Sequence, residues 1–518
     1  MELKTARRSG GRSRKSVRQS KKSIDQLEWG IPYNTDNFVE PLSEEGVNKV
    51  HDATMQVLEE IGIEFLNEEA KKVLSDAGCK VDRNSDNVKM DRSWVKEMIS
   101  KAPSEFEIFP RNINRSVKIG GRNMAFVNVS SPPNVMDLDR GRRVGDFESF
   151  KDLMKLTQYF NCIHLAGGYP VEPVDIHASV RHLDCLYEKL TLTDKVCHAY
   201  SLGSQRVEDA IEMAKIASGL NEDEFFSKPR IYTNINSSSP LKHDYPMLDG
   251  AMRFARKGQP VFVTPFTLAG AMAPVTMTGA VVQSLAEGLA AIALLQYINP
   301  GTPCVFGTFT SNVDMKSGAP AFGTPEYIRA TQITGQMARY YGLPLRASNA
   351  CAANAPDGQA IWESLNSLWA ASTGGVNVVY HSAGWLEGGL IASYEKFVMD
   401  CEVLQQFQRY FDPVISDVGQ DSLAVNAIKE VGPNGHFFGC DHTQERYTNA
   451  FYSPFLSDWR NYEAWEQDGA EWTHQRANKI WKDILKEFEA PKIDIAVKDE
   501  LKSFVDRRKS EGGVKTDF

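Results

Sequence analysis

The alternation of short β-rich segments with helix-compatible stretches constrains the fold of this chain most strongly. Between residues 121 and 412, each β-rich segment is followed by a stretch in which apolar residues recur at helical spacing. Strands that alternate with helices are typical of parallel βαβ units. The eight β-rich segments are Ala125–Val129, Ile163–Gly167, Val196–Tyr200, Arg230–Ile235, Pro260–Thr264, Cys304–Thr308, Pro344–Ser348 and Val376–His381.

Eight successive units predict an α/β fold, a (β/α)8 TIM barrel with helical N-terminal and C-terminal extensions. A doubly wound open sheet is the alternative, but no G-x-G-x-x-G sequence follows the first strand. The barrel is assigned to residues 121–412, after a disordered basic tail (1–28) and an N-terminal helical region (29–120). We expect a C-terminal helical region (413–490) to pack on the barrel, followed by a charged tail (491–518).

Charge and apolar content limit the partners of the chain. The net charge of −9 gives no overall attraction to nucleic acid or to an anionic membrane. The first residues are rich in Lys and Arg, which fits either a solvated tail or an RNA-binding one. The most apolar stretch, Gly279–Tyr297, is interrupted by Gln283 and Glu287, which argues against a membrane span. Eight cysteines without a C-x-x-C pair, and no recognisable signal peptide, predict reduced thiols and a cytoplasmic location.

The carboxyl ends of the predicted strands are polar, aromatic and poor in charge, and a barrel carries its working residues there. The chain has no H-E-x-x-H, phosphate-binding loop or G-x-S-x-G motif. His177 and His182 are poorly spaced for one helix face, so we expect no metal site. Candidate catalytic residues are His381, Glu387 and Asn349. Predicted substrate-binding residues are Tyr169, Asn234, Phe266, Thr308, Arg346, Tyr380, His381, Trp385 and Tyr394, with Tyr200 and Phe309 as further walls of a pocket.

Each of these assignments has a structural alternative. His381 ends an apolar strand before a glycine-rich loop, which suits contact with substrate, but a histidine bonded to the backbone would fit as well. Glu387 fits either a cationic ligand or solvent. Aromatic faces attract quaternary ammonium groups by about 0.5–2 kcal/mol per contact, although any one ring could be ordinary core.

Several motifs, in order along the chain, resemble those of the trimethylamine methyltransferase family. The similarity runs from about residue 40 to about residue 485. The motifs are Pro300-Gly301-Thr302-Pro303, Asp314-Met315-Lys316-Ser317-Gly318, Gly323-Thr324-Pro325-Glu326, Tyr341-Gly342-Leu343-Pro344, Tyr380-His381-Ser382-Ala383-Gly384-Trp385, Ser393-Tyr394-Glu395-Lys396-Phe397 and Glu430-Val431-Gly432-Pro433.

The resemblance implies a TIM barrel that moves a methyl group from a small methylated amine to the cobalamin of a separate, cognate corrinoid protein. The chain itself is then expected to hold no cofactor tightly. Archaeal members that demethylate trimethylamine carry pyrrolysine shortly after a Tyr-Gly-Leu-Pro segment, and Cys351 stands at the equivalent position here. Members without pyrrolysine resemble glycine betaine methyltransferases, so we expect a betaine-like quaternary or tertiary methylamine as substrate.

Methyl transfer from a charged nitrogen to Co(I) depends on positioning and desolvation, and it needs no acid–base pair. A substrate carboxylate would need a donor, for which His381, Asn349, Arg346 and Asn234 are available. Three alternatives stay open: a barrel lyase or aldolase, an inactive betaine-binding or corrinoid-docking barrel, and methyl transfer to an acceptor other than cobalamin. The sequence is also compatible with a homo-oligomer.

Overall fold

Eight parallel strands form the central sheet of the computed structural model, which describes residues 24–82 and 84–515. Their order is β6-β19-β18-β15-β13-β11-β10-β9, and a parallel bridge between Val127 and Leu165 joins the first strand to the last. The sheet is therefore closed, and the predicted barrel is confirmed. The strands are β6 (Ala125–Phe126), β9 (Leu165–Ala166), β10 (Val196–His198), β11 (Ile231–Ile235), β13 (Val261–Val263), β15 (Cys304–Gly307), β18 (Leu345–Ser348) and β19 (Val378–Tyr380), one within each predicted segment.

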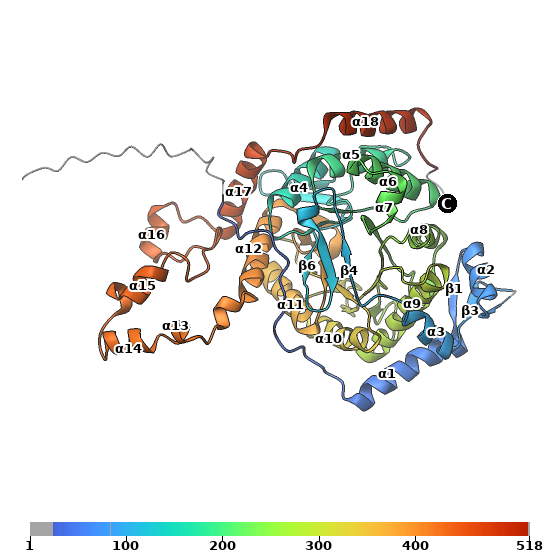
Figure 1. Cartoon of the computed structure of the whole chain (residues 1–518), viewed down its shortest axis with the longest axis horizontal. Helices are drawn as coiled ribbons and strands as arrows, with labels where there is room; N and C mark the ends of the chain where they lie inside the picture. The colour runs from blue at the N-terminus through green and yellow to red at the C-terminus, as the bar shows by residue number, and fades with distance from the viewer. Residues whose placement is uncertain (1–23, 83, 516–518) are drawn as a thin grey trace, which may run out of the picture.

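A ring of helices surrounds the strands (Figure 1). One helix, α9, is long and apolar enough to cross a membrane by length and composition, alone among the described helices. Most of this helix (Met277–Ile298) is buried, which accounts for its apolar sequence. It packs against β15 and the helices α1 (Glu44–Gln56), α3 (Arg92–Ile99), α8 (Tyr245–Arg256) and α10 (Pro325–Tyr340). The ring consists of α4 (Phe147–Tyr159), α5 (Arg181–Leu192), α6 (Ser204–Ser218), α8 (Tyr245–Arg256), α9 (Met277–Ile298), α10 (Pro325–Tyr340), α11 (Gly358–Gly374) and α12 (Tyr394–Tyr410), with a short α7 (Glu222–Phe226) after α6.

Short polar side chains fix where several of these helices begin. Asp244, Thr324 and Asp357 each accept a hydrogen bond from a backbone N–H in the first turn of α8, α10 and α11. Ser393 does the same for α12. Such caps satisfy donors that have no partner within the helix. Because each cap follows a loop from the carboxyl end of a strand, it also holds the end of that loop.

An antiparallel hairpin closes the amino end of the barrel. It consists of β4 (Glu105–Ile108) and β5 (Val117–Gly120). Ile108, Val117 and Ile119 join the apolar side chains that fill the barrel interior, such as Phe262 and Val305. In Figure 1, β4 lies over the centre of the ring of helices. The interior is therefore packed at this end, as in other barrels of this type.

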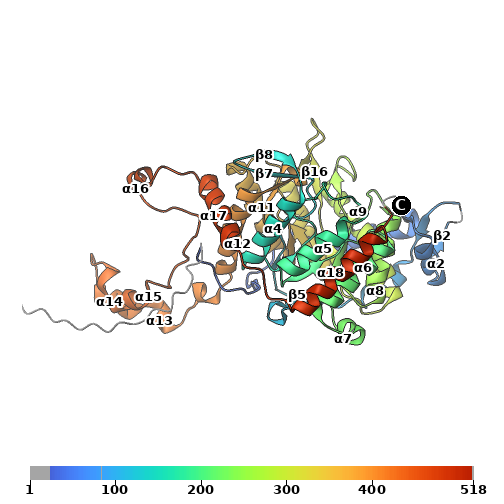
Figure 2. The ribbon, with the colours of Figure 1, turned by 90° about the horizontal axis from the view of Figure 1, so that it is seen from above.

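Two small sheets surround the carboxyl ends of the barrel strands. Figure 2 shows β7, β8 and β16 together on one side of the molecule. The first sheet contains β20 (Trp385–Leu386), β21 (Ile391–Ser393), β7 (Asn134–Asp137) and β8 (Gly141–Val144). The second contains β14 (Leu268–Ala269), β16 (Ser311–Val313) and β17 (Pro320–Ala321).

The region before the barrel contains strands as well as the predicted helices. The helices are α1 (Glu44–Gln56), α2 (Glu68–Asp76) and α3 (Arg92–Ile99), and the strands are β1 (Ile63–Phe65), β2 (Lys80–Val81) and β3 (Asn87–Lys89). β1 also pairs with β12 (Lys242–His243), which ties this region to the barrel. Strands of two or three residues are too short to show an alternating pattern, so the sequence indicated helices only. Residues 1–23 of the predicted basic tail lie outside the described residues.

The C-terminal region differs from the expected helical layer on the barrel. After α12, residues 413–472 extend to one side of the barrel (Figure 1), and we call this segment the arm. Its helices are α13 (Gln420–Leu423), α14 (Val425–Val431), α15 (Asp441–Arg446) and α16 (Tyr462–Gln467). The chain then returns as α17 (Thr473–Glu487), which packs on α12 and α4.

The segment predicted as a charged tail contains a helix, α18 (Ile495–Ser510), which packs on α5 and α6. Leu501, Phe504 and Val505 are buried there. Arg508 donates to the carboxylate of Asp209 at 2.7 Å. These apolar residues lie at helical spacing within a highly charged stretch, so composition alone concealed the helix.

Candidate functional site

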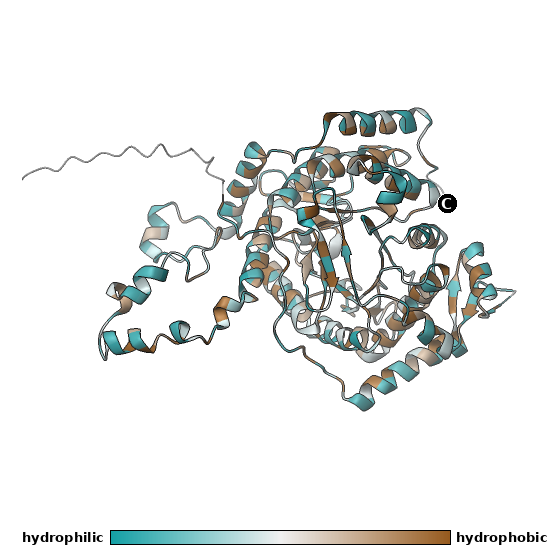
Figure 3. Ribbon diagram, in the orientation of Figure 1, coloured by the Kyte–Doolittle hydropathy of each residue, from teal (hydrophilic) through white to brown (hydrophobic). Residues whose placement is uncertain are grey.

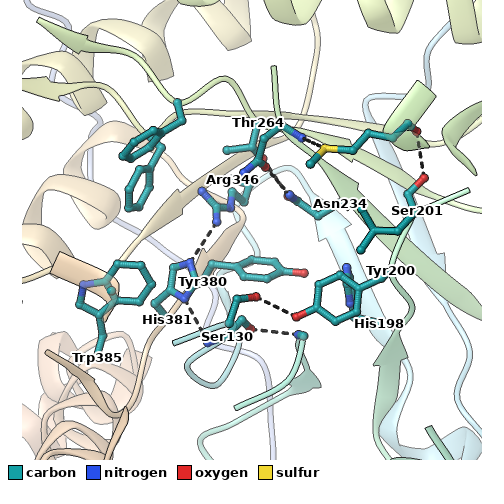
Figure 4. Close-up of a pocket in the computed structure, with 18 of the residues that line it drawn as sticks. Ser130, His198, Tyr200, Ser201, Asn234, Thr264, Arg346, Tyr380, His381 and Trp385 are labelled. Atoms are coloured by element: carbon teal, nitrogen blue, oxygen red, sulfur yellow. Dashed lines mark hydrogen bonds between the residues drawn. The ribbon is translucent and has the colours of Figure 1, made fainter. Parts of the chain in front are cut away.

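A cavity of about 400 Å³ opens at the carboxyl ends of the barrel strands (Figure 4). Each of the eight strands, or the loop directly after it, contributes to the lining. Among the described residues that line the cavity there is no Asp or Glu. The lining residues are Ser130, Ser131, Gly168, His198, Tyr200, Ser201, Leu202, Asn234, Asn236, Met247, Thr264, Phe266, Phe309, Arg346, Tyr380, His381, Trp385, Gly388 and Gly389.

Aromatic rings form a large part of the cavity wall. The ring centre of Phe309 lies 5.0 Å from that of Phe266 and 6.0 Å from that of Trp385. Tyr200 and Tyr380 line the same cavity. Ring faces carry partial negative charge and attract cations, quaternary ammonium groups in particular. With no carboxylate in the lining, these rings are the groups there that can favour a cationic ligand.

Arg346 is a buried cation without an anion. Its side chain projects from β18 and the residue is 4% exposed. The guanidinium carbon lies 4.6 Å from the ring centre of Tyr380, and Nε and Nη1 have no hydrogen-bond partner in the described structure. Burial lowers the pKa of Arg346 to about 10, so the group stays protonated at neutral pH. Burying a charge without a partner is costly, which makes this position suitable for an anionic ligand group.

His381 presents a second donor beside Arg346. The backbone N–H of Ser130 donates to Nδ1 of His381 at 3.2 Å. Burial and the nearby Arg346 hold the pKa of His381 well below its usual value, so the ring is neutral. A neutral ring that accepts at Nδ1 carries its proton on Nε2. Nε2 lies 3.4 Å from Nη2 of Arg346, so two N–H donors face the same part of the cavity.

The polar side chains on the opposite wall are already engaged within the protein. The hydroxyl of Tyr200 accepts from the backbone N–H of Tyr169 at 2.9 Å. The amide of Asn234 accepts from the hydroxyl of Thr264 at 2.8 Å and donates to Asn236 at 2.7 Å. These bonds fix the shape of the wall. Arg346 and His381 are therefore better placed than Asn234 to receive an anionic group.

The structure brings eight predicted site residues together around the cavity and places others behind it. The eight that line the cavity are Tyr200, Asn234, Phe266, Phe309, Arg346, Tyr380, His381 and Trp385. The hydroxyl of Thr308 points to Thr334 of α10 at 3.4 Å. Tyr169 lies behind Tyr200, with ring centres 4.6 Å apart. Asn349 donates to the carbonyl of Ser382 at 2.9 Å, below the cavity lining.

Tyr394 lies on the outside of the barrel. Its ring centre is 4.6 Å from that of Trp481 in α17. Tyr394 is the first residue of α12, where a side chain faces the neighbouring helix layer. The sequence motif placed it near the strand ends but did not show which way it faces.

Glu387 and Cys351 lie next to the lining without being part of it. The carboxylate of Glu387 accepts from Arg142 of β8 at 3.0 Å, at the rim beside Gly388. The thiol of Cys351 is fully buried and donates to the carbonyl of Trp385 at 3.0 Å. Burial raises the pKa of this thiol to about 12. Among the described residues, no group of three or more His, Cys, Asp or Glu side chains is placed to hold a metal ion.

Eleven lining residues were not predicted as site residues: Ser130, Ser131, Gly168, His198, Ser201, Leu202, Asn236, Met247, Thr264, Gly388 and Gly389. Met247 comes from the first turn of α8, and Ser201 donates to its carbonyl at 3.0 Å. A search at strand ends cannot find a residue that reaches the cavity from a helix. His198 was recognisable as a strand residue, but its side-chain direction was not.

Comparisons with known proteins give one family. The sequence model of the trimethylamine methyltransferase (MTTB) family matches residues 7–513. The chain is 37% identical over 473 residues to a glycine betaine methyltransferase of Desulfitobacterium hafniense (strain Y51), covering 91% of this chain and 98% of the relative. It is 28% identical to trimethylamine methyltransferase MttB of Desulfitobacterium hafniense (strain DSM 10664 / DCB-2), covering 91% and 94%.

A further relative agrees with this assignment, and a solved structure agrees with the fold. The chain is 29% identical to a proline betaine:corrinoid methyltransferase of Eubacterium limosum, covering 76% of this chain and 82% of the relative. The solved structure of MtmB in complex with hydroxylamine superposes with a TM-score of 0.50 at 10% identity, covering 91% of this chain and 90% of that one. At that identity the structural match supports the fold alone.

Proposed function

The chain belongs to the trimethylamine methyltransferase family, and from this we propose that it moves a methyl group from a betaine-like quaternary amine to the cobalt of a corrinoid protein. The names of its relatives include methyltransferases of glycine betaine, proline betaine and trimethylamine. We choose among these substrate types by the charge and the hydrogen-bond donors of the cavity lining.

The paired donors of Arg346 and His381 carry the proposal. A betaine has a carboxylate and a quaternary ammonium in one molecule. The carboxylate would accept from Nη2 of Arg346 and Nε2 of His381, which lie 3.4 Å apart. The methyl groups would then lie among the rings of Phe266, Phe309 and Trp385, which line the same cavity.

Charge balance favours a zwitterion over a simple amine. Trimethylamine in its protonated form would bring a second cation beside Arg346, in a cavity whose described lining has no carboxylate. Like charges repel strongly where water is excluded. A betaine would neutralise Arg346 and leave its own ammonium to the aromatic rings.

In the proposed reaction, the chain binds the amine substrate, orients it and excludes water from it. The corrinoid protein supplies a cobalt nucleophile. As the carbon–nitrogen bond breaks, the electron pair stays on nitrogen, and the amine leaves neutral without a proton donor. Arg346 and His381 would hold the carboxylate so that one methyl group points toward the cavity mouth, beside Gly388 and Gly389. We further propose a cytoplasmic location and a cognate corrinoid partner.

The test is a methylation assay with several amines. The purified chain is mixed with Co(I) cobalamin and either glycine betaine, another betaine or trimethylamine, and methyl-Co(III) formation is followed in the visible spectrum. We expect methylation with a betaine and none with trimethylamine. Methylation with trimethylamine and none with any betaine would refute the assigned substrate class. Saturable binding of betaine without methylation, with the corrinoid protein also present, would point to an inactive binding barrel or another methyl acceptor.

A further inference from the structure

The arm carries an unusual number of exposed apolar side chains. Phe438 is 82% exposed and Phe451 is 85% exposed. Figure 3 shows apolar as well as hydrophilic stretches along the arm. The other large exposed apolar residues of the arm are Val414, Ile415, Val418, Leu423, Val425, Ile428, Phe437, Tyr447, Trp459, Tyr462 and Trp472.

The arm has no core of its own that would explain these residues. Between 413 and 451, the structure buries only Ala427 and Cys440, and no described residue of that stretch belongs to a hydrophobic cluster of the barrel. Its helices are four to seven residues long. Helices this short are not stable in water without tertiary packing. The arm therefore needs a surface to pack on.

The barrel fixes the arm at one point along its length. The hydroxyl of Tyr452 donates to Glu402 of α12 at 2.8 Å. The backbone N–H groups of Phe455 and Leu456 donate to the other carboxylate oxygen at 3.0 Å. On either side of this anchor, 413–451 and 457–472 extend away from the barrel. Both segments are therefore free to contact another molecule while the anchor holds them to this barrel.

The barrel also has an exposed aromatic face, formed by two tryptophans of α11. Trp362 and Trp369 lie two turns apart on α11, so both face the same side of the helix, and they are 58% and 40% exposed. The ring centre of Trp369 lies 5.3 Å from that of Tyr410 at the end of α12. The helices α11 and α12 lie on the side of the barrel from which the arm extends (Figure 1).

We propose that the arm docks on a second copy of this chain, over the face of α11 and α12 that carries Trp362 and Trp369. A two-fold axis on this side of the barrel would let each arm cover the partner's aromatic face, so that both surfaces are satisfied in one reciprocal interface. The seven exposed rings of the arm present on the order of 900 Å², at about 200 Å² for each fully exposed ring. A stable interface buries about 800 Å² per partner.

The position of the arm favours a second copy over a corrinoid protein. Figure 2 shows α13, α14 and α15 beside the barrel, away from the side where β7, β8 and β16 surround the cavity mouth, and α16 to one side of that mouth. A methyl acceptor has to reach that mouth and leave again in each cycle. Aromatic and aliphatic residues that are this exposed are typical of permanent interfaces.

The experiment measures the mass of the full chain in solution by sedimentation velocity, at micromolar concentration. We expect the wild type to sediment as a dimer or a higher even oligomer. The double variant Phe438→Asp, Phe451→Asp and the single variant Trp362→Asp should both shift toward the monomer of 57.8 kDa. Ile495→Asp is the control, because Ile495 is 78% exposed at the start of α18, on another side of the barrel. Circular dichroism checks that each variant is folded.

A monomeric wild type would overturn the proposal. An oligomer that the arm variant leaves intact would overturn it as well. Dissociation by the arm variant but not by Trp362→Asp would refute the assignment of the α11 face. Dissociation by both variants, with Ile495→Asp unchanged, supports the whole interface.

Discussion

Nη2 of Arg346 and Nε2 of His381 lie 3.4 Å apart, and both nitrogens carry protons. The proton on Nε2 follows from the bond at the other ring nitrogen, which accepts from the backbone N–H of Ser130. The contact drawn between them in Figure 4 would be a hydrogen bond in the other tautomer, but with Nδ1 accepting from Ser130 both nitrogens are donors. They share an acceptor well, and a carboxylate oxygen is the acceptor that the proposed substrate supplies.

The first prediction concerns the charge at Arg346. Arg346→Gln should raise the KM for glycine betaine about 10- to 100-fold, because hydrogen bonds to charged groups contribute about 1.5–3 kcal/mol. The same variant should bring the rates of methyl transfer from betaine and from trimethylamine closer together, since it removes the buried cation that repels a protonated amine. Steady-state methyl transfer measures both effects. Arg329→Gln on the exposed face of α10 is the matched control and should change neither. An unchanged KM in Arg346→Gln would refute the carboxylate contact.

The second prediction concerns the backbone and the donor at His381. Its φ is 55°, in the left-handed region, where Asn is tolerated better than most residues. His381→Asn should therefore keep the fold and raise the KM for betaine less than His381→Ala does, for which we expect roughly tenfold. Equal KM values in the two variants and the wild type would remove His381 from the binding site.

The pH dependence of binding gives a separate test of the same side chain. The pKa of His381 is held well below 6.5, so the ring stays neutral between pH 6 and pH 8. Arg346 is protonated over the same interval, because its pKa is about 10. We therefore expect a KM for betaine that is flat from pH 6 to pH 8. A steep change in KM between pH 7 and pH 6 would show that a protonating histidine controls binding.

The third prediction concerns Cys351, the residue that we expect from the sequence resemblance at the position equivalent to pyrrolysine. Its thiol is buried, contacts the carbonyl of Trp385 and has a pKa of about 12, so it is a poor nucleophile near neutral pH. Cys351→Ser should leave kcat within about threefold of the wild type, and iodoacetamide at pH 8 should not inactivate the enzyme. Cys79, a half-buried thiol outside the barrel whose pKa burial also raises to about 12, serves as the control in peptide mapping. Rapid labelling of Cys351 with loss of activity would contradict the buried position.

Much of the barrel could be predicted from the sequence because each strand and helix shows its own pattern. Segments such as Cys304–Thr308 are apolar and short, and the helices after them are amphipathic, so the eight units repeat visibly. The arm could not be predicted, because a long connection contains apolar residues whether or not they pack on the same chain. The helix α18 was hidden by its many charges.

The site could be predicted only in part, because neighbouring residues at a strand end face different ways. Phe309 lines the cavity, whereas Thr308 faces α10. Arg346 lines it from within a strand, whereas Asn349, three residues later, bonds to backbone beneath it. Period-two alternation breaks down where a strand becomes a loop. The pairing of Arg346 with His381 depends on the register of β18 and β19, which the sequence does not encode locally.

The last prediction concerns stability and pH, through a histidine far from the cavity mouth. His164 is fully buried: the N–H of Phe126 donates to Nδ1 at 2.9 Å, and Nε2 lies 2.9 Å from the carbonyl of Gly30. Burial lowers the pKa of His164 to about 3. Below about pH 6.5 the unfolded chain binds a proton here that the folded chain does not, so the free energy of unfolding falls as pH falls. Above pH 6.5 this histidine makes no contribution to the slope of the free energy of unfolding against pH.

Because of His164 alone, the free energy of unfolding should fall by about 2 kcal/mol between pH 6.5 and pH 5, since each pH unit corresponds to about 1.4 kcal/mol. The buried histidines His198 and His381 act in the same direction, because their pKa values are also lowered by burial. Urea unfolding at pH 7 and pH 5 measures the slope. In His164→Gln, whose amide can accept from Phe126 and donate to Gly30 without titrating, the slope should be smaller by that amount. An identical slope in the variant would mean that His164 takes up its proton without unfolding, and that the bond from Phe126 does not hold it neutral.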